Sequence, residues 1–250
     1  VQFQAAAATL HRDDIHIAIQ VKIAGNGVNG FADAVVGAYL NPVGGQAFIY
    51  QGAGTAPSEP STTLENPSAT MEDGFGIVVA TAGDSNGDGF SDVVIGDHLH
   101  DETYEDEGAA YVFQGSPSGI LADSVRTLTS PHAELEGNFG WRIASAGDVN
   151  RDGYADVLVG ATGEDAPVEN SGRAYLFHGT ESGLSLAPNR IFDNPDDSQL
   201  NAGFGLSVAN GGDIDGDGFP NIFVGAPLQN EARGRAFLYA ADELGFPTTP

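Results

Sequence analysis

Short runs of apolar, β-branched residues recur along the chain, and glycine-rich polar segments bound each run. Three of the runs are Asp92-Val-Val-Ile-Gly96, Asp156-Val-Leu-Val-Gly160 and Asn221-Ile-Phe-Val-Gly225, and a fourth is Ala34-Val-Val-Gly-Ala38. Apolar runs of this length with turn residues at both ends are typical of buried strands. We therefore predict four buried strands with similar surroundings.

Each buried run has the same neighbours along the chain. An aromatic strand follows it, at residues 47–50, 110–113, 174–177 and 236–239, and more polar strands come next at 62–65, 125–128 and 190–192. The pairs Phe75-Gly76, Phe139-Gly140 and Phe204-Gly205 precede the last three runs and set a period of about 64 residues. Four strands at such a period are the signature of a propeller blade. The fold class predicted is all-β, a β-propeller of four blades with four antiparallel strands each.

One domain is expected over residues 1–250, with blade units at about 8–65, 66–129, 130–193 and 194–250. The last unit stops where its outer strand should begin, whereas residues 2–7 lie one outer strand ahead of the first unit. If strand 1–7 completes the last blade, the ring closes and two exposed edges disappear. The alternatives are a part of a larger propeller, or a half-ring that dimerises.

One acidic nonapeptide occurs three times, each time leading into a buried run. The copies, at 84–92, 148–156 and 213–221, carry Asp or Asn at their first, third, fifth and ninth positions. Side-chain oxygens on a glycine-bearing loop suit a hard cation with many ligands, and calcium fits best. Asp-Gly and Asn-Gly dipeptides also form ordinary turns. Three copies in register favour about three calcium ions.

The first half of this loop resembles the calcium loop of an EF-hand, but the second half departs from it. An EF-hand places a bidentate Glu on an exiting helix, whereas Ile95, Val159 and Val224 stand at that position here. The ion is therefore expected in a connection between two strands.

A shortened fourth loop, with Asn26, Asn29 and Asp33, opens the chain. Its one-residue deletion and reduced ligand charge favour a plain turn over a metal site.

Acidic residues outnumber basic ones by 35 to 9, which gives a formal charge of -26. This excess argues against nucleic acid and anionic membranes as partners. Three divalent ions would bring the charge from -26 to about -20, because each adds two positive charges. Removing calcium is therefore expected to destabilise the fold.

The chain has no cysteine, so calcium is the remaining cross-link. Weak oxygen-ligand sites stay filled where calcium is millimolar, which indicates a secreted or cell-surface protein. No apolar stretch approaches the roughly 20 residues that span a bilayer, so direct membrane insertion is not expected.

Phe-Gly, the acidic loop and Gly-Ala at one spacing resemble the FG-GAP repeats, the blades of integrin α-subunit propellers and of related bacterial and lectin-like proteins. Gly160-Ala161 and Gly225-Ala226-Pro227 supply the second half of the motif, whereas the second unit has Gly96-Asp97. Integrin propellers have seven blades, and this chain shows four.

The resemblance implies calcium between the first and second strands of a blade. The implied ligands are Asp84, Asn86, Asp88, the Phe90 carbonyl and Asp92 in the first loop, Asp148, Asn150, Asp152, the Tyr154 carbonyl and Asp156 in the second, and Asp213, Asp215, Asp217, the Phe219 carbonyl and Asn221 in the third. Because Asn221 lacks a carboxylate, the third site is expected to bind more weakly.

Partners of such propellers usually dock on the opposite face, where loops 97–107, 162–171 and 193–202 are expected. His98 and His100, with Asp101 and Glu102, could bind a transition metal, although a solvated acidic loop is the simpler interpretation. Tyr104, Trp141, His132 and Arg142 could form a sugar-stacking patch. Trp141 directly follows Phe139-Gly140, so it could instead pack on its own blade.

No catalytic motif is found: the chain has no nucleophile elbow, no zinc-protease motif and no cysteine nucleophile. The function favoured is an extracellular calcium-binding module for adhesion or recognition of a protein or glycan ligand, as a monomer or homodimer. A calcium-dependent polysaccharide lyase or hydrolase is an alternative that rests on fold analogy, and a structural unit of a larger surface protein is another. A groove with a basic residue beside a carboxylate or tyrosine would favour the enzyme.

Overall fold

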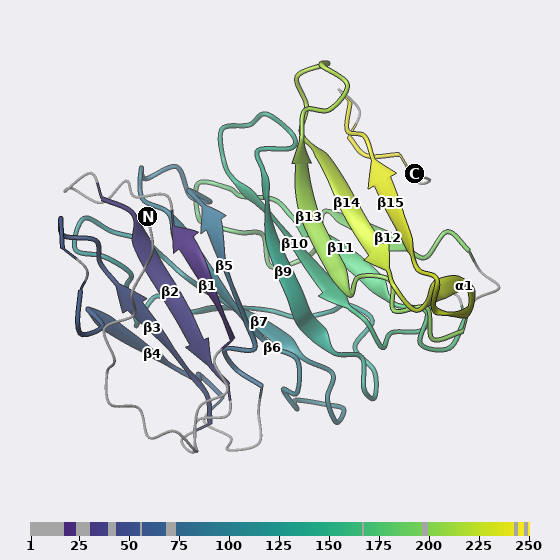
Figure 1. The fold of residues 1–250 in the computed structure, drawn as a ribbon, viewed down its shortest axis with the longest axis horizontal. Helices are drawn as coiled ribbons and strands as arrows, with labels where there is room; N and C mark the ends of the chain where they lie inside the picture. Colours follow the sequence, from purple (N-terminus) through teal and green to yellow (C-terminus); the bar gives the residue numbers. More distant parts are fainter. Residues whose placement is uncertain are drawn as a thin grey trace.

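The computed structural model describes residues 18–23, 31–39, 44–55, 57–68, 74–166, 168–196, 200–242, 245–247 and 250. These residues form four antiparallel sheets in a row (Figure 1). Within each sheet the strands are hydrogen-bonded in chain order, so every connection joins neighbouring strands. Sheet 1 contains β1 (Ala18–Ile23), β2 (Asp33–Ala38), β3 (Gln46–Tyr50) and β4 (Thr62–Glu65).

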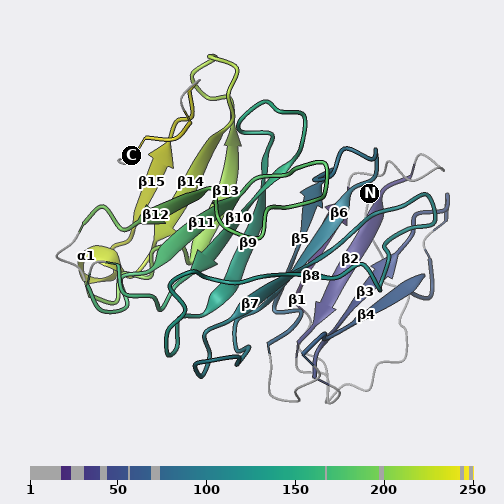
Figure 2. The same cartoon turned by 180° about the vertical axis from the view of Figure 1, so that it is seen from behind.

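The next three sheets repeat this order. Sheet 2 contains β5 (Val78–Gly83), β6 (Asp92–Asp97), β7 (Ala109–Phe113) and β8 (Arg126–Leu128). Sheet 3 contains β9 (Phe139–Gly147), β10 (Asp156–Ala161), β11 (Arg173–Phe177) and β12 (Arg190–Asp193). Sheet 4 contains β13 (Ser207–Gly212), β14 (Asn221–Ala226) and β15 (Arg235–Tyr239), with the one-turn helix α1 (Gln229–Ala232) between the last two strands. Figure 2 shows β8 and β12 from behind.

The strands predicted from the apolar runs and aromatic segments are confirmed in all four sheets. The polar strand predicted at 62–65 coincides with β4, and those at 125–128 and 190–192 correspond to β8 and β12. In the described part of the chain, sheet 4 has three strands. The strand predicted at residues 1–7 lies outside the described residues.

Each sheet packs face to face on the next, because alternate residues of a strand point to opposite faces. In β6, Val93 and Ile95 pack toward sheet 1, whereas Val94 packs toward sheet 3. In β10, Leu158 likewise packs toward sheet 4. The buried core therefore consists of three apolar layers, one between each pair of consecutive sheets, and both faces of sheets 2 and 3 are covered.

The four sheets are consistent with propeller blades, and their first strands β1, β5, β9 and β13 follow one another side by side. Sheets 1 and 4 lie at opposite ends of the row in Figure 1. The described residues thus show a row of sheets, and the predicted closure of the ring is not seen among them. No helix among the described residues has the length and apolar character needed to cross a membrane.

Candidate metal loops

The three acidic loops occupy the same place in three successive sheets. Loop 84–92 connects β5 to β6, loop 148–156 connects β9 to β10, and loop 213–221 connects β13 to β14. Each therefore joins the first strand to the second. Because the sheets pack in one orientation, the three loops lie along the same rim of the row (Figure 1).

The first aspartate of each loop holds the turn together. In the first loop, Asp84 accepts backbone N–H groups from Asp88 at 3.0 Å and from Gly89 at 2.9 Å, one on each carboxylate oxygen. Asp88 accepts the Phe90 N–H at 2.9 Å. Asn86 accepts the Asp88 N–H at 3.0 Å and donates its amide to Asp88 at 2.9 Å. The side chains at positions one, three and five therefore face one another inside the turn.

The second loop repeats these contacts. Asp148 accepts N–H groups from Asp152 at 3.0 Å and from Gly153 at 2.9 Å, and Asp152 accepts the Tyr154 N–H at 3.0 Å. Asn150 donates to Asp152 at 2.8 Å, as its counterpart does in the first loop. Two loops with different intervening residues thus adopt one geometry.

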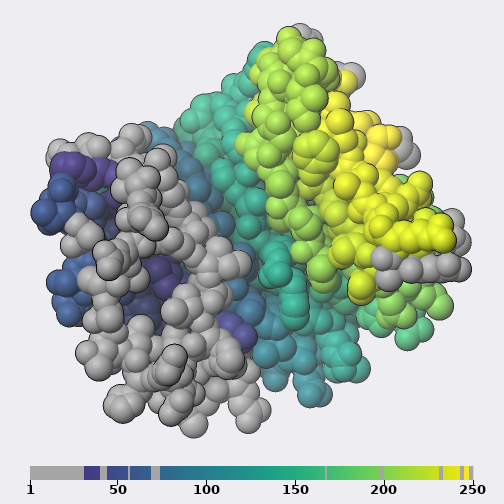
Figure 3. All heavy atoms as spheres, viewed as in Figure 1, coloured from purple at the N-terminus to yellow at the C-terminus, as the bar shows by residue number. Residues whose placement is uncertain are grey.

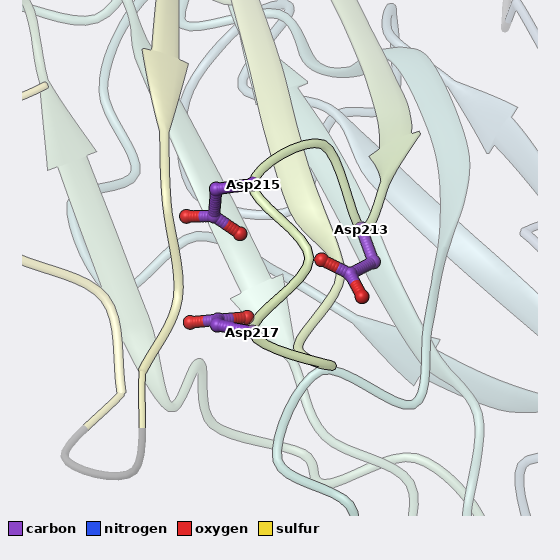
Figure 4. A group of neighbouring side chains, drawn as sticks. All are labelled: Asp213, Asp215 and Asp217. Carbon is purple, nitrogen blue, oxygen red and sulfur yellow. The ribbon is translucent and has the colours of Figure 1, made fainter.

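In the third loop three carboxylates lie close together. One oxygen from each of Asp213, Asp215 and Asp217 lies within 4.8 Å of the other two (Figure 4). Asp213 accepts N–H groups from Gly216 at 2.7 Å and Gly218 at 2.9 Å. All three side chains are exposed, so the charges repel one another unless a cation lies between them. Among the described residues this is the one such group of three acidic, histidine or cysteine side chains.

The side chain of the ninth residue braces the loop: it accepts one hydrogen bond from the loop itself and one from the turn after the third strand. Asp156 is buried and accepts the Val149 N–H at 2.8 Å and the Gly179 N–H at 2.9 Å, one on each oxygen. Asp92 does the same with Ser85 at 3.2 Å and Gly115 at 2.8 Å. Burial raises the pKa of Asp156 to about 7 and that of Asp92 above its usual value, although the N–H donors oppose this. These carboxylates therefore tie the loop to the turn after the third strand, a contact that their prediction as metal ligands did not include.

The third loop has lost half of this brace. Asn221 accepts the Ile214 N–H at 2.9 Å through Oδ1, but its buried Nδ2 has no hydrogen-bond partner. An amide offers one acceptor atom where a carboxylate offers two. The substitution therefore weakens the link between the loop and sheet 4 as well as the charge available to a cation.

Neighbouring loops contact one another. The Ala155 and Thr180 N–H groups donate to the Asp84 carbonyl at 2.9 Å and the Ser85 carbonyl at 3.0 Å, which joins the second unit to the first loop. On the other side, Arg151 Nε donates to the Gly218 carbonyl at 2.9 Å, and the guanidinium lies 4.1 Å from the centre of the Phe219 ring. Arg151 was not among the functional residues predicted from the sequence.

Arg151 was recognisable from its position in the loop. It adopts a positive φ of 58°, at the place where the first and third loops carry Gly87 and Gly216. Positive φ is uncommon for residues other than glycine and is costly unless the surroundings compensate for it. An arginine at a position where the other loops have glycine therefore indicates that its side chain makes a stabilising contact, here with Gly218 and Phe219.

The recurring spacing of Phe-Gly and Gly-Ala along the chain has a structural cause at the contact between sheets. The Gly205 N–H donates to the Gly225 carbonyl within sheet 4 at 3.1 Å. On its other side, the Gly205 carbonyl oxygen would lie 2.1 Å from a Cβ at Gly160 of sheet 3. The same contact joins Gly37 to Gly76 and Gly96 to Gly140, again at 2.1 Å. Two glycines from consecutive sheets thus allow the backbones to touch.

The comparisons with known proteins agree with this arrangement. The FG-GAP repeat model matches residues 139–177 and 204–239. The chain contains FG-GAP repeats. The two matches begin at the Phe of a Phe-Gly pair and end in the aromatic strand, so each spans the contact glycines, the acidic loop and the first three strands of one sheet.

Curated proteins similar to this chain include integrin α subunits. Integrin alpha-IIb of Mus musculus is 39% identical over 157 residues, which are 61% of this chain and 15% of the relative. Integrin alpha-PS3 of Drosophila melanogaster is 38% identical over 157 residues, 61% of this chain and 13% of the relative. Integrin alpha-5 of Xenopus laevis is 34% identical over 180 residues, 68% of this chain and 16% of the relative. The chain thus matches about one-seventh of the length of these relatives.

Of the fourth, shortened loop in the FG-GAP chain, Asn26 and Asn29 lie outside the described residues. Asp33 accepts the Gly52 N–H at 2.9 Å, which corresponds to the contact between Asp92 and Gly115. The contact with the turn after the third strand is therefore present in sheet 1 as well.

The residues predicted for a ligand face divide between core and surface. His98 is buried, its ring centre lies 4.2 Å from that of Trp141, and burial lowers its pKa to about 4. His100 lies beside Tyr111 instead, 3.4 Å from its hydroxyl. Trp141 therefore packs against His98, which agrees with the alternative that this ring packs on the protein. The two histidines contact different aromatic residues, His98 the Trp141 ring and His100 the Tyr111 hydroxyl.

Tyr104 is exposed in an acidic turn whose backbone is held by hydrogen bonds. The buried Glu107 accepts backbone N–H groups from Glu102 at 2.9 Å, Thr103 at 2.8 Å and Tyr104 at 3.2 Å. Three charge-assisted hydrogen bonds to one carboxylate fix the backbone of this turn. Glu107, which sequence analysis did not single out, thereby positions the Tyr104 ring in solvent.

A buried polar group links Glu164 of the loop at 162–171 to strand β11. Glu164 receives hydrogen bonds from Tyr175 and, at 3.2 Å, from Arg173, and Tyr175 also contacts Ser130 at 2.9 Å. This combination of a basic residue, a carboxylate and a tyrosine would favour an enzyme if it lined a groove. Glu164 and Tyr175 are both 0% exposed, so no substrate reaches them in this structure.

Replacing Glu164 by glutamine is expected to stabilise the protein above neutral pH. Burial raises the pKa of Glu164 from 4.5 to about 7. Because the folded state holds the proton more tightly than the unfolded state, this group favours folding at low pH and loses that contribution as pH rises through 7. Glu164→Gln should gain about 2 kcal/mol of unfolding free energy over wild type on going from pH 5 to pH 8.

Urea unfolding of both proteins at the two pH values measures this difference. Glu181→Gln, at an exposed site, is the matched control and should show no pH-dependent difference. An equal difference between Glu164→Gln and wild type at both pH values would contradict the prediction. Gln229, which occupies the equivalent position in sheet 4 and is buried, shows that the fold accepts glutamine there.

Proposed function

We propose that this chain is an extracellular, calcium-stabilised FG-GAP module for adhesion or ligand recognition, in which the ions have a structural role. The observation that carries the proposal is the arrangement of the three loops, in each of which the side chains at positions one, three and five lie close together. The relatives are integrin α subunits, and an adhesive role is carried over from them to this chain as part of the proposal.

The loop residues fit a calcium ion. Oxygen ligands from Asp84, Asn86 and Asp88, with their counterparts in the other two loops, are the hard donors that calcium prefers. Glycine follows at position six, where φ is 89° at Gly89, 93° at Gly153 and 91° at Gly218, so the chain can turn back around an ion. When bound, calcium supplies positive charge that offsets the repulsion among these carboxylates.

The opposite end of the sheets supplies a surface for a ligand. Glu107 holds the backbone of residues 102–104 in place, and Asp101, Glu102 and Glu105, which lie within three positions of the exposed Tyr104 in the sequence, are exposed as well. A rigid aromatic residue among acidic groups suits a basic protein surface better than an acidic one. We therefore propose a positively charged protein ligand for this turn, with calcium loops fixing the sheets that carry it.

Calorimetric titration with calcium tests the metal part of the proposal. The expected result is binding of about three ions, with two tighter sites and one weaker site, because the third loop carries Asn221 in place of a carboxylate. Asp84→Asn combined with Asp88→Asn should remove one tight site and leave the others. A titration with no heat of binding and no change in tyrosine fluorescence at millimolar calcium would contradict it.

Asn221→Asp is the gain-of-affinity variant. The variant supplies the carboxylate that the other two loops have, and an acceptor oxygen replaces the buried Nδ2 that has no hydrogen-bond partner. The third site should therefore approach the affinity of the other two. Asn210→Asp is the matched control, because Asn210 lies just before the same loop on an exposed position and is not a predicted ligand. If both variants raise the affinity equally, net charge accounts for the effect and the ligand assignment of position nine is wrong.

A further inference from the structure

Consecutive acidic loops contact one another through equivalent positions. Position seven of each loop is aromatic, and in the second and third loops its ring lies on position four of the loop before it. A Cβ at Gly87 would lie 2.8 Å from Cε1 of Tyr154. The Arg151 guanidinium lies 4.1 Å from the centre of the Phe219 ring. Because the proposed calcium ligands include positions three and five and the carbonyl of position seven, these contacts join the ligand-bearing parts of neighbouring loops.

The first and second loops are also joined through the backbone. The Ala155 N–H, at position eight of the second loop, donates to the Asp84 carbonyl, at position one of the first loop, at 2.9 Å. Asp84 is a proposed ligand of the first site, and Ala155 lies between two proposed ligands of the second site. A displacement of either loop therefore disturbs a residue of the other.

The equivalent hydrogen bond cannot form between the second and third loops. The third loop carries Pro220 at position eight, and proline has no backbone N–H to donate to the Asp148 carbonyl. The proline ring nevertheless lies close by, since a Cβ at Gly147, directly before Asp148, would lie 3.8 Å from Pro220 Cγ. The two loops thus adjoin at this point without the backbone hydrogen bond that joins the first two.

The Arg151 side chain joins these two loops instead. Its Nε donates to the Gly218 carbonyl at 2.9 Å, and the same peptide unit continues to Phe219, whose carbonyl is a proposed ligand. Residues 212–217 are all exposed, and Figure 3 shows the third loop, in yellow-green, projecting at the top of the molecule. Since Asn221 also retains only half of the brace found in the other loops, the contacts of Arg151 matter more for this loop.

We propose that Arg151 couples the third calcium site to the second, in place of the backbone hydrogen bond that Pro220 cannot make. This inference rests on the calcium sites of the proposed function. Arg151 lies between the proposed ligands Asn150 and Asp152, so an ion in the second loop fixes its backbone and holds the guanidinium against the third loop. The third loop then loses less conformational freedom when it binds its own ion, which gives positive cooperativity. By linkage, an ion in the third loop strengthens the second site by the same factor.

Repulsion between the two bound ions acts in the opposite direction. Packed sheets lie about 10 Å apart, and the screening length is about 8 Å at a physiological ionic strength of about 0.15 M. At that salt concentration the repulsion between ions in neighbouring loops is largely screened, whereas the direct contacts of Arg151 with Gly218 and Phe219 remain. The coupling is therefore best measured there.

Hydrogen exchange followed by mass spectrometry during a calcium titration reports on each loop separately. Asp148→Asn with Asp152→Asn removes the second site, and loop 213–221 should then need about fivefold more calcium for half-maximal protection than in the wild type. In Arg151→Gly, removal of the second site should leave the midpoint of the third loop unchanged. Gly87 and Gly216 occupy this position in the other loops, so glycine suits its backbone.

Arg233→Gly is the matched control. It removes the same charge at an exposed position next to α1, at the opposite end of β14 from the third loop, and should keep the fivefold difference. Pro220→Ala added to Arg151→Gly supplies the missing N–H and should restore the difference. A double variant that stays uncoupled would show that Pro220 is not the reason for the arginine.

Two further results would overturn the coupling itself. One is a third-loop midpoint that does not depend on the second site in the wild type, and the other is an undiminished dependence in Arg151→Gly. Both outcomes leave calcium-dependent protection of the loops in place, so the proposed function survives them. Absence of calcium-dependent protection in all three loops would instead contradict the calcium sites on which the coupling rests.

Discussion

Gly160→Ala is expected to be among the most destabilising single-methyl additions in this chain. The new Cβ would lie 2.1 Å from the Gly205 carbonyl oxygen of the next sheet, a distance that requires the two backbones to separate. Added volume at a close-packed contact typically costs 1–3 kcal/mol, and backbone cannot move aside as a side chain can, so a loss of about 3 kcal/mol is expected. For a protein of this size that lowers Tm by roughly 6–12 °C.

Gly225→Ala is the matched control, since Gly225 is the corresponding residue of sheet 4. Its nearest neighbour would be the Ser207 Cβ at 3.2 Å, and no backbone of a following sheet lies against it in the described structure. Ser207 must shift by a few tenths of an ångström to admit this methyl group, but alanine is preferred to glycine within a strand by about 0.5 kcal/mol, so the loss should be much smaller than that of Gly160→Ala. Differential scanning calorimetry of both variants measures the contrast. Equal losses in Tm would show that the methyl group acts within its own sheet and not at the contact between sheets.

Removal of calcium is expected to lower Tm by at least about 10 °C. A ligand present at a hundred times its Kd stabilises the folded state by about 2.7 kcal/mol per site, and the chain carries three proposed sites. Chelation also restores the full formal charge of -26, which adds repulsion between the loops. The comparison is a melting curve in millimolar calcium against one in excess chelator.

Two controls separate specific binding from general charge effects. Sodium chloride at 0.5 M should recover only the part of the loss that comes from repulsion, because monovalent ions screen charge without occupying the loops. Asp148→Asn with Asp152→Asn should lose about a third of the calcium-dependent change in Tm. Identical melting curves with calcium and chelator would falsify the structural role of the ion.

Local patterns were sufficient to predict the strands of the four sheets, whereas the closed ring predicted from them is not seen among the described residues. Apolar runs such as 92–96 and aromatic segments such as 110–113 are short, bounded by glycine and uniform in type, so their strands could be read directly. The relation between sheets was less accessible. That Gly160 lies against Gly205, 45 positions later, depends on how two complete sheets stack, which no local pattern specifies.

The residues of the acidic loops were named from the sequence, but the residues that contact them were named only in part. The loop residues were identified because three copies repeat one spacing. The hydrogen bond from the Gly179 N–H to Asp156 was not predicted, since Gly179 belongs to a different turn. Arg151 and Glu107 were missed for a similar reason: their roles depend on the neighbours that tertiary structure brings to them, the Phe219 ring for one and the backbone of residues 102–104 for the other.

The recurrence of one contact between consecutive sheets has an evolutionary consequence. A unit of about 64 residues inserted after sheet 2 would meet Val94 and Val112 on one side and the aromatic layer of sheet 3 on the other, and both would already suit it. Gene duplication by whole units therefore requires no compensating substitutions in the interior of the array. Selection for new packing acts on its two ends, and the number of units can change more readily than the sequence of any one of them.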